Sequence, residues 1–135
     1  MEPIKKTETL AVRSSQDVIQ VRQVARVWAV EMGFSLVDQT KIVTATSELA
    51  RNMVDFAGGG IVRLEALDQG SRLGLRLTFE DQGPGIPDIA LALKDGYSTR
   101  GGLGLGLGGS RRLMNEFEIH SRPGEGTRVI VTKWR

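Results

Sequence analysis

The sequence contains no cysteine, a single histidine (His120), few aromatic residues and no long run of apolar residues. The lack of cysteine excludes a disulfide framework and a thiolate metal site, and it fits a reducing compartment. No apolar stretch approaches the roughly 20 residues that a membrane-spanning helix needs. The opening segment, MEPIKKTETLAV, lacks the apolar core of a signal peptide. We therefore expect a cytoplasmic protein with no membrane association.

Charge and aromatic content argue against nucleic-acid binding. The formal net charge is only +2, and basic residues are scattered apart from short pairs such as Lys5-Lys6 and Arg111-Arg112. Aromatic residues make up 5% of the chain, which offers no stacking platform for bases. A hydrophobic content of 40% and a length of 135 residues are typical of one globular domain, which we expect to span residues 1–135.

Hydrophobic periodicity predicts two long helices in the first half of the chain. Apolar residues recur at helical spacing from Val18 to Met32, with Ser14 or Ser15 as the N-cap and Gly33 as the stop. A second helix is expected over residues 38–57. Its apolar stripe consists of Ile42, Ala45, Leu49, Met53 and Phe56.

Strand patterns follow, separated by turn signals. Strands are expected over residues 7–12, 61–67, 73–80, 117–121 and 127–134, and short helices over residues 88–94 and from within residues 98–109 to about residue 116. Because strands and helices come in blocks joined by hairpins, we expect an α+β two-layer sandwich. Its sheet should be mixed, with helices covering one face.

The second predicted helix carries a polar line beside its apolar stripe. Glu48 and Asn52 are four residues apart and share a face, with Thr44 and Asp55 in the same line. One interpretation is a solvated helix face. The other is a carboxylate and an amide oxygen that point into one cleft. The amide oxygen suits Mg²⁺, and the carboxylate could act as a general base.

A second cluster is the loop EDQGPGIPD, residues 80–88, which follows a predicted strand. Asp81 sits at the strand end, and Gly83 and Gly85 bracket Pro84, which allows a sharp turn and the close approach of a flat ligand. A carboxylate can accept a hydrogen bond from an exocyclic amine, so Asp81 is a candidate for binding adenine. An acidic β-turn without a ligand is the alternative, and the loop alone does not decide between them.

A third cluster, TRGGLGLGLGG over residues 99–109, interleaves glycine with leucine. Its backbone amides can turn toward phosphate, the following helix adds its positive end, and Arg100 adds a guanidinium group. A flexible linker explains it poorly, because leucines are interleaved and a helix follows at once. Gly104, Gly106 and Gly109 satisfy G-x-G-x-x-G, but no strand precedes them and no βαβ unit surrounds them. The Walker motif and the V-A-I-K and H-R-D motifs of protein kinases are absent.

In this order, the clusters resemble the motifs of the GHKL, or Bergerat-fold, ATPases. Glu48 and Asn52 are similar to the N box, residues 81–85 to the D-x-G-x-G box, and residues 102–106 to the glycine box of the ATP lid. Gly126-Thr127 is similar to a late Gly-Thr pair. Histidine kinases of this superfamily carry a separate helical domain with a phosphoacceptor histidine, which this sequence does not show, and we expect His120 to be an ordinary surface or hairpin histidine. The resemblance is therefore to the small branch of anti-sigma-factor kinases. Within it, residues 7–135 resemble the RsbT-type serine/threonine kinases of stressosome-type partner-switching modules.

The resemblance implies a site for ATP and Mg²⁺. Asn52 would coordinate the Mg²⁺ that bridges the phosphates, and Glu48 would take the proton from a serine or threonine hydroxyl. Asp81 would bind the adenine amine, with Thr127 assisting through water and Gly83 and Gly85 shaping the loop. Arg100 would contact the γ-phosphate. The phosphates would be cradled by the backbone amides of Gly102, Leu103, Gly104, Leu105 and Gly106.

The resemblance also implies protein partners. The substrate would be a small STAS-domain antagonist, and a PP2C-type phosphatase would be activated by binding. The expected function is thus an ATP-dependent serine/threonine-protein kinase that also regulates by binding. A non-catalytic, nucleotide-gated binding module is one alternative, although the retained Glu48 argues against it. An anti-sigma factor that holds a sigma factor is the other, although the segments SELARN and GPGIPD favour the phosphatase-activating type.

Overall fold

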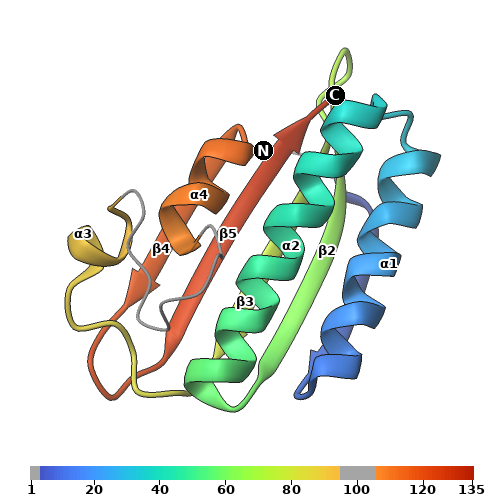
Figure 1. Ribbon diagram of the computed structural model, residues 1–135. Coiled ribbons are helices and arrows are strands. Elements are labelled where there is room, and N and C mark those ends of the chain that lie inside the picture. Colours follow the sequence, from blue (N-terminus) through green and yellow to red (C-terminus); the bar gives the residue numbers. More distant parts are fainter. Residues whose placement is uncertain (1–3, 95–105) are drawn as a thin grey trace.

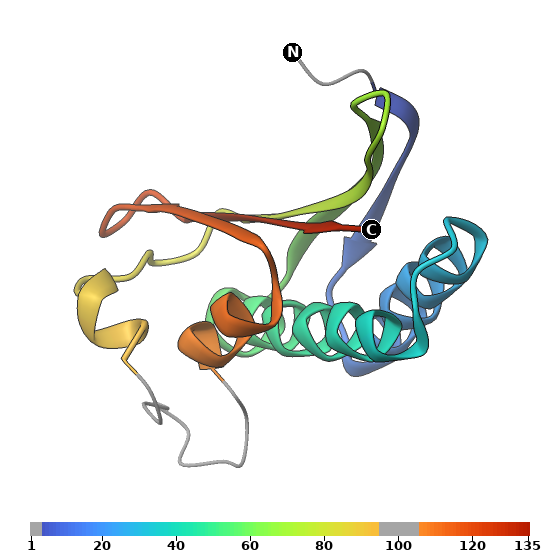
Figure 2. The same cartoon turned by 90° about the horizontal axis from the view of Figure 1, so that it is seen from above.

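The computed structural model describes residues 4–94 and 106–135 of the chain. Its strands form one sheet in the order β1-β2-β3-β5-β4, and α1, α2 and α4 lie on one face of that sheet (Figure 1, Figure 2). The predicted α+β two-layer architecture is therefore confirmed. The elements are β1 (Ile4–Val12), α1 (Ser15–Glu31), α2 (Leu36–Ala57), β2 (Gly60–Asp68), β3 (Leu73–Asp81), α3 (Ile89–Ala92), α4 (Gly106–Leu113), β4 (Glu116–Ser121) and β5 (Thr127–Trp134).

Every neighbouring pair of described strands is antiparallel, so the expectation of a mixed sheet is wrong. β4 does run in the same direction as β3, from which it is separated in sequence by α3 and α4. However, β5 returns between these two strands and pairs with both. The hairpins β2–β3 and β4–β5 thus meet through β3 and β5, and no parallel pair forms.

Serine caps fix where the two long helices begin. The Ser14 hydroxyl accepts from the Asp17 amide at 3.2 Å, and the Ser35 hydroxyl accepts from the Asp38 amide at 3.1 Å. The second cap starts α2 at Leu36, slightly before the predicted start. At the other end, Gly58 adopts a left-handed conformation with φ of 73° and terminates α2.

The core lies between the inner face of the sheet and the helices α1 and α2. A buried apolar side chain of this kind stabilises the fold by about 2 kcal/mol. Phe56 is an exception to the predicted stripe, because it is 48% exposed. It points in a direction similar to that of the buried Leu49, seven residues earlier, but it lies in the last turn of α2, so its exposure comes from its position at the helix end. The buried core residues include Val21, Trp28, Ile42, Leu49, Met53, Val62, Leu64, Leu75, Leu77, Phe79, Val129 and Val131.

No helix of the described residues covers the outer face of the sheet, which is covered by its own long side chains. The Arg76 guanidinium lies 3.0 Å from the Glu65 carboxylate, whose side chain is only 9% exposed. Trp134 sits over Gly74, and the Arg72 guanidinium lies 4.1 Å from the Trp134 ring centroid. None of the helices in the described part of the chain has the length and apolar character that a membrane span requires.

Candidate functional site

The predicted site residues that the structure describes come from α2, β3, β5, α4 and the loop after β3. The C-terminal half of α2, the end of β3 and the start of β5 lie at the lower end of the molecule in Figure 1, while α4 lies beside α2 and higher up. Glu48 and Asn52 are on α2, Asp81 ends β3, Thr127 begins β5 and Gly106 begins α4. These segments are far apart in the sequence but pack against one another in the fold.

Asp81 and Thr127 are register partners across the β3–β5 pair. Asp81 follows Leu77 and Phe79 on the inner face of β3, because side chains alternate along a strand. Its Oδ1 atom accepts a hydrogen bond from the Gly83 amide at 2.9 Å. The second carboxylate oxygen can accept from a ligand amine, which is the role predicted for this residue.

Ser121 is a polar neighbour of this pair that the sequence motifs did not reveal. Its hydroxyl lies 2.7 Å from that of Thr127 and donates to the Gly126 carbonyl at 3.1 Å. It also accepts from the Ile86 amide at 2.7 Å, which fastens the loop after β3 to the β4–β5 hairpin. The predicted hairpin could have pointed to Ser121, because the tight connection places it opposite Thr127.

The glycines of the loop after β3 lie close to protein atoms. A side chain at Gly83 would collide with Ala57 of α2, and one at Gly85, whose φ is 77°, would collide with the Arg122 carbonyl. A side chain at Gly126 would collide with the Asp81 carbonyl. These glycines therefore let the loop, the end of α2 and the β4–β5 hairpin pack together around Asp81. The predicted close approach of a flat ligand stays a prediction.

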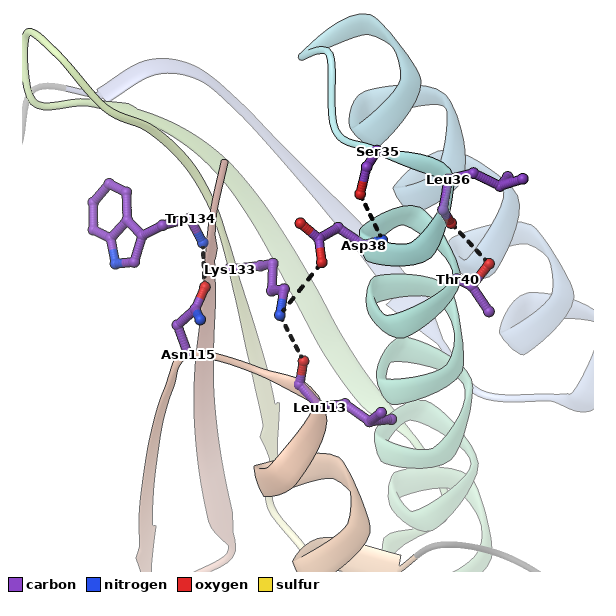
Figure 3. Close-up of polar contacts among 8 residues, drawn as sticks. All are labelled: Ser35, Leu36, Asp38, Thr40, Leu113, Asn115, Lys133 and Trp134. Carbon is purple, nitrogen blue, oxygen red and sulfur yellow. Dashed lines mark hydrogen bonds and ion pairs between the residues drawn. The ribbon is translucent and has the colours of Figure 1, made fainter.

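Glu48 and Asn52 are half-buried on α2, as a cleft-lining pair would be. Asn52 lies two heptads after Asp38, so the two side chains point in similar directions from the helix. Asp38 faces Lys133, which also contacts Leu113 of α4, so this side of α2 is directed toward α4 (Figure 3). The Glu48 side chain is 17% exposed, and its carboxylate lies 4.0 Å from the Arg51 guanidinium in a long ion pair.

The start of α4 is the only part of the predicted glycine lid that is described. Gly106, with φ of 66°, begins the helix, and a side chain at Gly108 would collide with the Leu93 carbonyl just after α3. α4 therefore packs tightly on the end of α3. Arg100, Gly102, Leu103, Gly104 and Leu105 lie outside the described residues.

The donors present fit a nucleotide with a divalent cation. An amide oxygen, a carboxylate and the amino-terminal end of a glycine-rich helix are groups that bind Mg²⁺, an amine and phosphate respectively. Within residues 4–94 and 106–135, no three histidine, cysteine, aspartate or glutamate side chains gather as a metal-binding group. A cation held by Asn52 and by phosphate oxygens needs no such group, because Mg²⁺ commonly binds through few protein ligands.

A surface hollow of about 340 Å³ borders Asp81 on the side of the C-terminal end of α2. Its lining includes Arg13, Gly59 and Glu80, but not Glu48, Asn52 or Thr127. It is therefore a neighbouring depression at the end of the sheet and does not coincide with the predicted site as a whole.

His120 behaves as the ordinary hairpin histidine that was expected. It lies on β4 with a side chain that is 56% exposed, and its Nε2 atom is 3.2 Å from the Glu118 carboxylate. Side chains alternate along β4, so this surface pair lies on the opposite face of the sheet from Asp81.

Comparison with known proteins places the chain among ATPases. Residues 37–135 match the family of histidine kinase-, DNA gyrase B-, and HSP90-like ATPases. The chain is 50% identical over 118 residues to the serine/threonine-protein kinase RsbT of Bacillus subtilis (strain 168), covering 87% of this chain and 89% of that relative. It is 29% identical over 140 residues to an anti-sigma F factor of Thermoanaerobacter sp. (strain X514), covering 99% and 96% respectively.

The fold has a counterpart among solved structures. The crystal structure of the RsbU and RsbW domains of Rv1364c from Mycobacterium tuberculosis matches with a TM-score of 0.63 and 22% identity. The match covers 96% of this chain and 32% of that longer chain.

The chain therefore belongs to the histidine kinase-, DNA gyrase B-, and HSP90-like ATPase family, within its branch of RsbT-type serine/threonine-protein kinases. These matches confirm the predicted family, its α+β fold and the predicted serine/threonine-protein kinase class. Membership of an ATPase family implies use of a nucleotide, and the relatives include anti-sigma F factors.

Proposed function

We propose that this protein binds ATP with Mg²⁺ at the end of the sheet and transfers the γ-phosphoryl group to a serine or threonine of a STAS-domain antagonist. The observation that carries the proposal is the pairing of Asp81 with Thr127 at the end of the sheet where α2 ends. α2 carries Glu48 and Asn52 on its polar face. Asp81 and Thr127 can thereby bind adenine, while Glu48 and Asn52 in the same region act on the phosphates.

The residues divide these tasks by their chemistry. The free oxygen of Asp81 accepts a hydrogen bond from the adenine amine, and the Thr127 hydroxyl orients a water beside it. The Asn52 amide oxygen binds Mg²⁺, while the amides at the start of α4 face the phosphates. Bound ATP supplies the phosphoryl group. Arg100 and the amides of residues 102–105 complete the charge neutralisation that phosphoryl transfer requires.

Glu48 is the proposed general base. It accepts the proton of the substrate hydroxyl as the hydroxyl oxygen bonds to the γ-phosphorus and the bond from that phosphorus to the bridging oxygen breaks, so that ADP leaves. A carboxylate that is 17% exposed can still meet a protein substrate at the surface. Its long pair with the exposed Arg51 contributes little to stability and can give way.

We further propose that the same protein activates a PP2C-type phosphatase by binding it. The higher identity to RsbT than to the anti-sigma F factor supports this assignment over direct capture of a sigma factor. Because some relatives are anti-sigma F factors, binding of a sigma factor is the second candidate function. Pull-down of the protein against a PP2C-type phosphatase and against a sigma factor from the same genome separates the two.

Radiolabelled transfer tests the catalytic proposal. The wild-type protein, incubated with [γ-³²P]ATP, Mg²⁺ and the STAS-domain antagonist, should label the antagonist, whereas Glu48→Ala should bind ATP but give no label. Labelling by Glu48→Ala at the wild-type rate would show that Glu48 is not the general base. If the wild-type protein binds ATP but does not label the antagonist, the result would favour the nucleotide-gated binding module.

A further inference from the structure

Lys133 is a buried lysine on the inner face of β5. It follows Val129 and Val131 in the alternation that points into the core, and its side chain is only 8% exposed. Removing an ammonium group from water is strongly unfavourable unless the group is paired and hydrogen-bonded. An apolar side chain would fill this position at lower energetic cost, so the lysine needs a specific reason to be there.

Two groups face the ammonium nitrogen of Lys133 (Figure 3). It donates a hydrogen bond to the Leu113 carbonyl at 3.1 Å, and the Asp38 carboxylate lies at the longer distance of 3.7 Å. Leu113 is the last residue of α4, where carbonyls lack partners within the helix and carry the negative end of its dipole. Lys133 therefore caps the C-terminal end of α4, and Asp38 links this cap to the first turn of α2.

The chain that leaves α4 is fastened to the end of β5 by further hydrogen bonds. The Asn115 amide donates to the Thr132 carbonyl at 3.0 Å, and the Trp134 amide donates to the Asn115 side chain at 2.6 Å. The Trp134 indole also donates to the Glu116 carboxylate at 2.6 Å. The C-terminal end of α4 is thus held to a central strand of the sheet.

α4 depends on such external contacts. It has eight residues, and three of them are the glycines Gly106, Gly108 and Gly109. Glycine weakens a helix, and helices of this length are marginal alone. Gly108 is required for packing on the Leu93 carbonyl, so the helix cannot gain stability from alanine there. The contacts at its C-terminal end therefore add to the packing of Leu107 and Leu113 on the core in holding α4.

We propose that Lys133 is a positioning residue for nucleotide binding. It joins the last turn of α4 to the first turn of α2, and so fixes the placement of the two helices that line the phosphate end of the site. The inference rests on the proposed function, in which the start of α4 faces the phosphates. Lys133 itself acts at the opposite end of a helix of about 12 Å and does not touch the nucleotide.

Three variants test this role. Lys133→Met keeps the length of the side chain and suits an apolar interior, whereas Lys133→Arg keeps a cationic donor. Lys6→Met is the matched control, because Lys6 forms an ion pair with Glu31 at the same 3.7 Å but is 54% exposed. The measurements are the Kd for ATP with Mg²⁺ by calorimetry and the amide hydrogen exchange of Leu107–Leu113 in the nucleotide-free protein.

Lys133→Met should raise the Kd for ATP about tenfold, because α4 loses its C-terminal cap. The amides of α4 should exchange faster while those of β2 and β3 keep their protection. Lys133→Arg should retain more affinity than Lys133→Met, and Lys6→Met should match the wild type. These results together support a positioning role over a general loss of stability.

Other outcomes overturn the proposal. If the ATP affinity of Lys133→Met stays within twofold of the wild type, or if its α4 amides stay protected, the cap does not position the site. Affinity for Lys133→Arg at or below that for Lys133→Met would show that volume, not the cation, matters. A wild-type protein that binds no ATP would instead refute the proposed function and, with it, this role.

Discussion

Asp81 and Thr127 lie directly opposite each other on β3 and β5, although α3, α4 and β4 separate them in sequence. Opposed residues on antiparallel strands have Cβ atoms about 5 Å apart, so both side chains project from one place at the end of the sheet. Ser121 on β4 continues the row from the far side of Thr127. The fold therefore assembles the proposed adenine end of the site through strand pairing alone.

Asp81→Asn should weaken ATP binding about 10- to 100-fold, because an amide can turn an N–H toward the adenine amine and leave it unpaired. The fold should persist, since an amide oxygen can still accept from the Gly83 amide. Calorimetric titration with ATP and a thermal melt measure the two effects.

Asp68→Asn is the matched control for this experiment. Asp68 accepts from the Gly70 amide at 2.8 Å, which repeats the local geometry of Asp81 and Gly83 in the β2–β3 turn. It should leave ATP affinity unchanged. Equal losses in both variants would mean that the effect comes from the turn and not from a ligand contact.

Glu48→Ala should leave the Kd for ATP within a few fold of wild type and reduce phosphoryl transfer by a factor of at least about 100, the range typical of a lost general base. Transfer to the STAS-domain antagonist is followed by phosphoprotein mass spectrometry. Arg51→Ala serves as the comparison, because it removes the cation 4.0 Å from Glu48 and keeps the carboxylate. Similar loss of transfer in the Arg51 variant would argue that the pair, not the base, is needed.

Gly126→Ala should destabilise the protein by about 3 kcal/mol or more, because it combines an unfavourable φ with a steric collision. Gly126 has a φ of 82°, and its new methyl group would meet the Asp81 carbonyl. Gly124→Ala isolates the backbone effect, since its φ is 79° and no atom lies within 4 Å of the added carbon. It should lose only about 1 kcal/mol. Urea unfolding gives both values, and equal losses would contradict the close packing of Gly126 on β3.

Arg76→Met should destabilise the protein by about 2 kcal/mol, because it leaves the Glu65 carboxylate buried without its cation. Glu65 is 7% exposed, and its oxygen lies 3.0 Å from the Arg76 guanidinium. Arg63→Met, on the same outer face, should change stability by less. Replacing both partners, as Glu65→Leu with Arg76→Met, should recover most of the loss in chemical unfolding. Failure of the double variant to recover would show that the pair does more than satisfy a buried charge.

The elements with local signals were predictable from sequence. Ser14 begins α1 and Gly58 ends α2 by local backbone chemistry, and the alternation over Thr127–Trp134 marks β5 at the residues observed. Asp81 and Thr127 could be placed at strand ends, because each stands in a short motif beside a strand pattern, whereas their binding roles stay predictions. Each of these signals lies within a few neighbouring residues, so it can be interpreted without the tertiary structure.

Features that depend on long-range placement were not predictable in the same way. The antiparallel sheet follows from the insertion of β5 between β3 and β4, which no local pattern encodes. Phe56 shares the helical period of the core yet is 48% exposed, because it lies in the last turn of α2. Lys133 falls on the inner side of β5, where its charge is satisfied by the end of a helix that begins far earlier in the chain.

Calorimetric titration of the wild-type protein with ATP, in the presence of Mg²⁺ and again with the cation removed by chelator, tests most directly whether this end of the sheet is a nucleotide site. We expect saturable binding at a single site that weakens sharply without Mg²⁺, since Asn52 acts on the phosphates only through the cation. Absence of binding at cellular ATP concentrations in both conditions would contradict the proposed site.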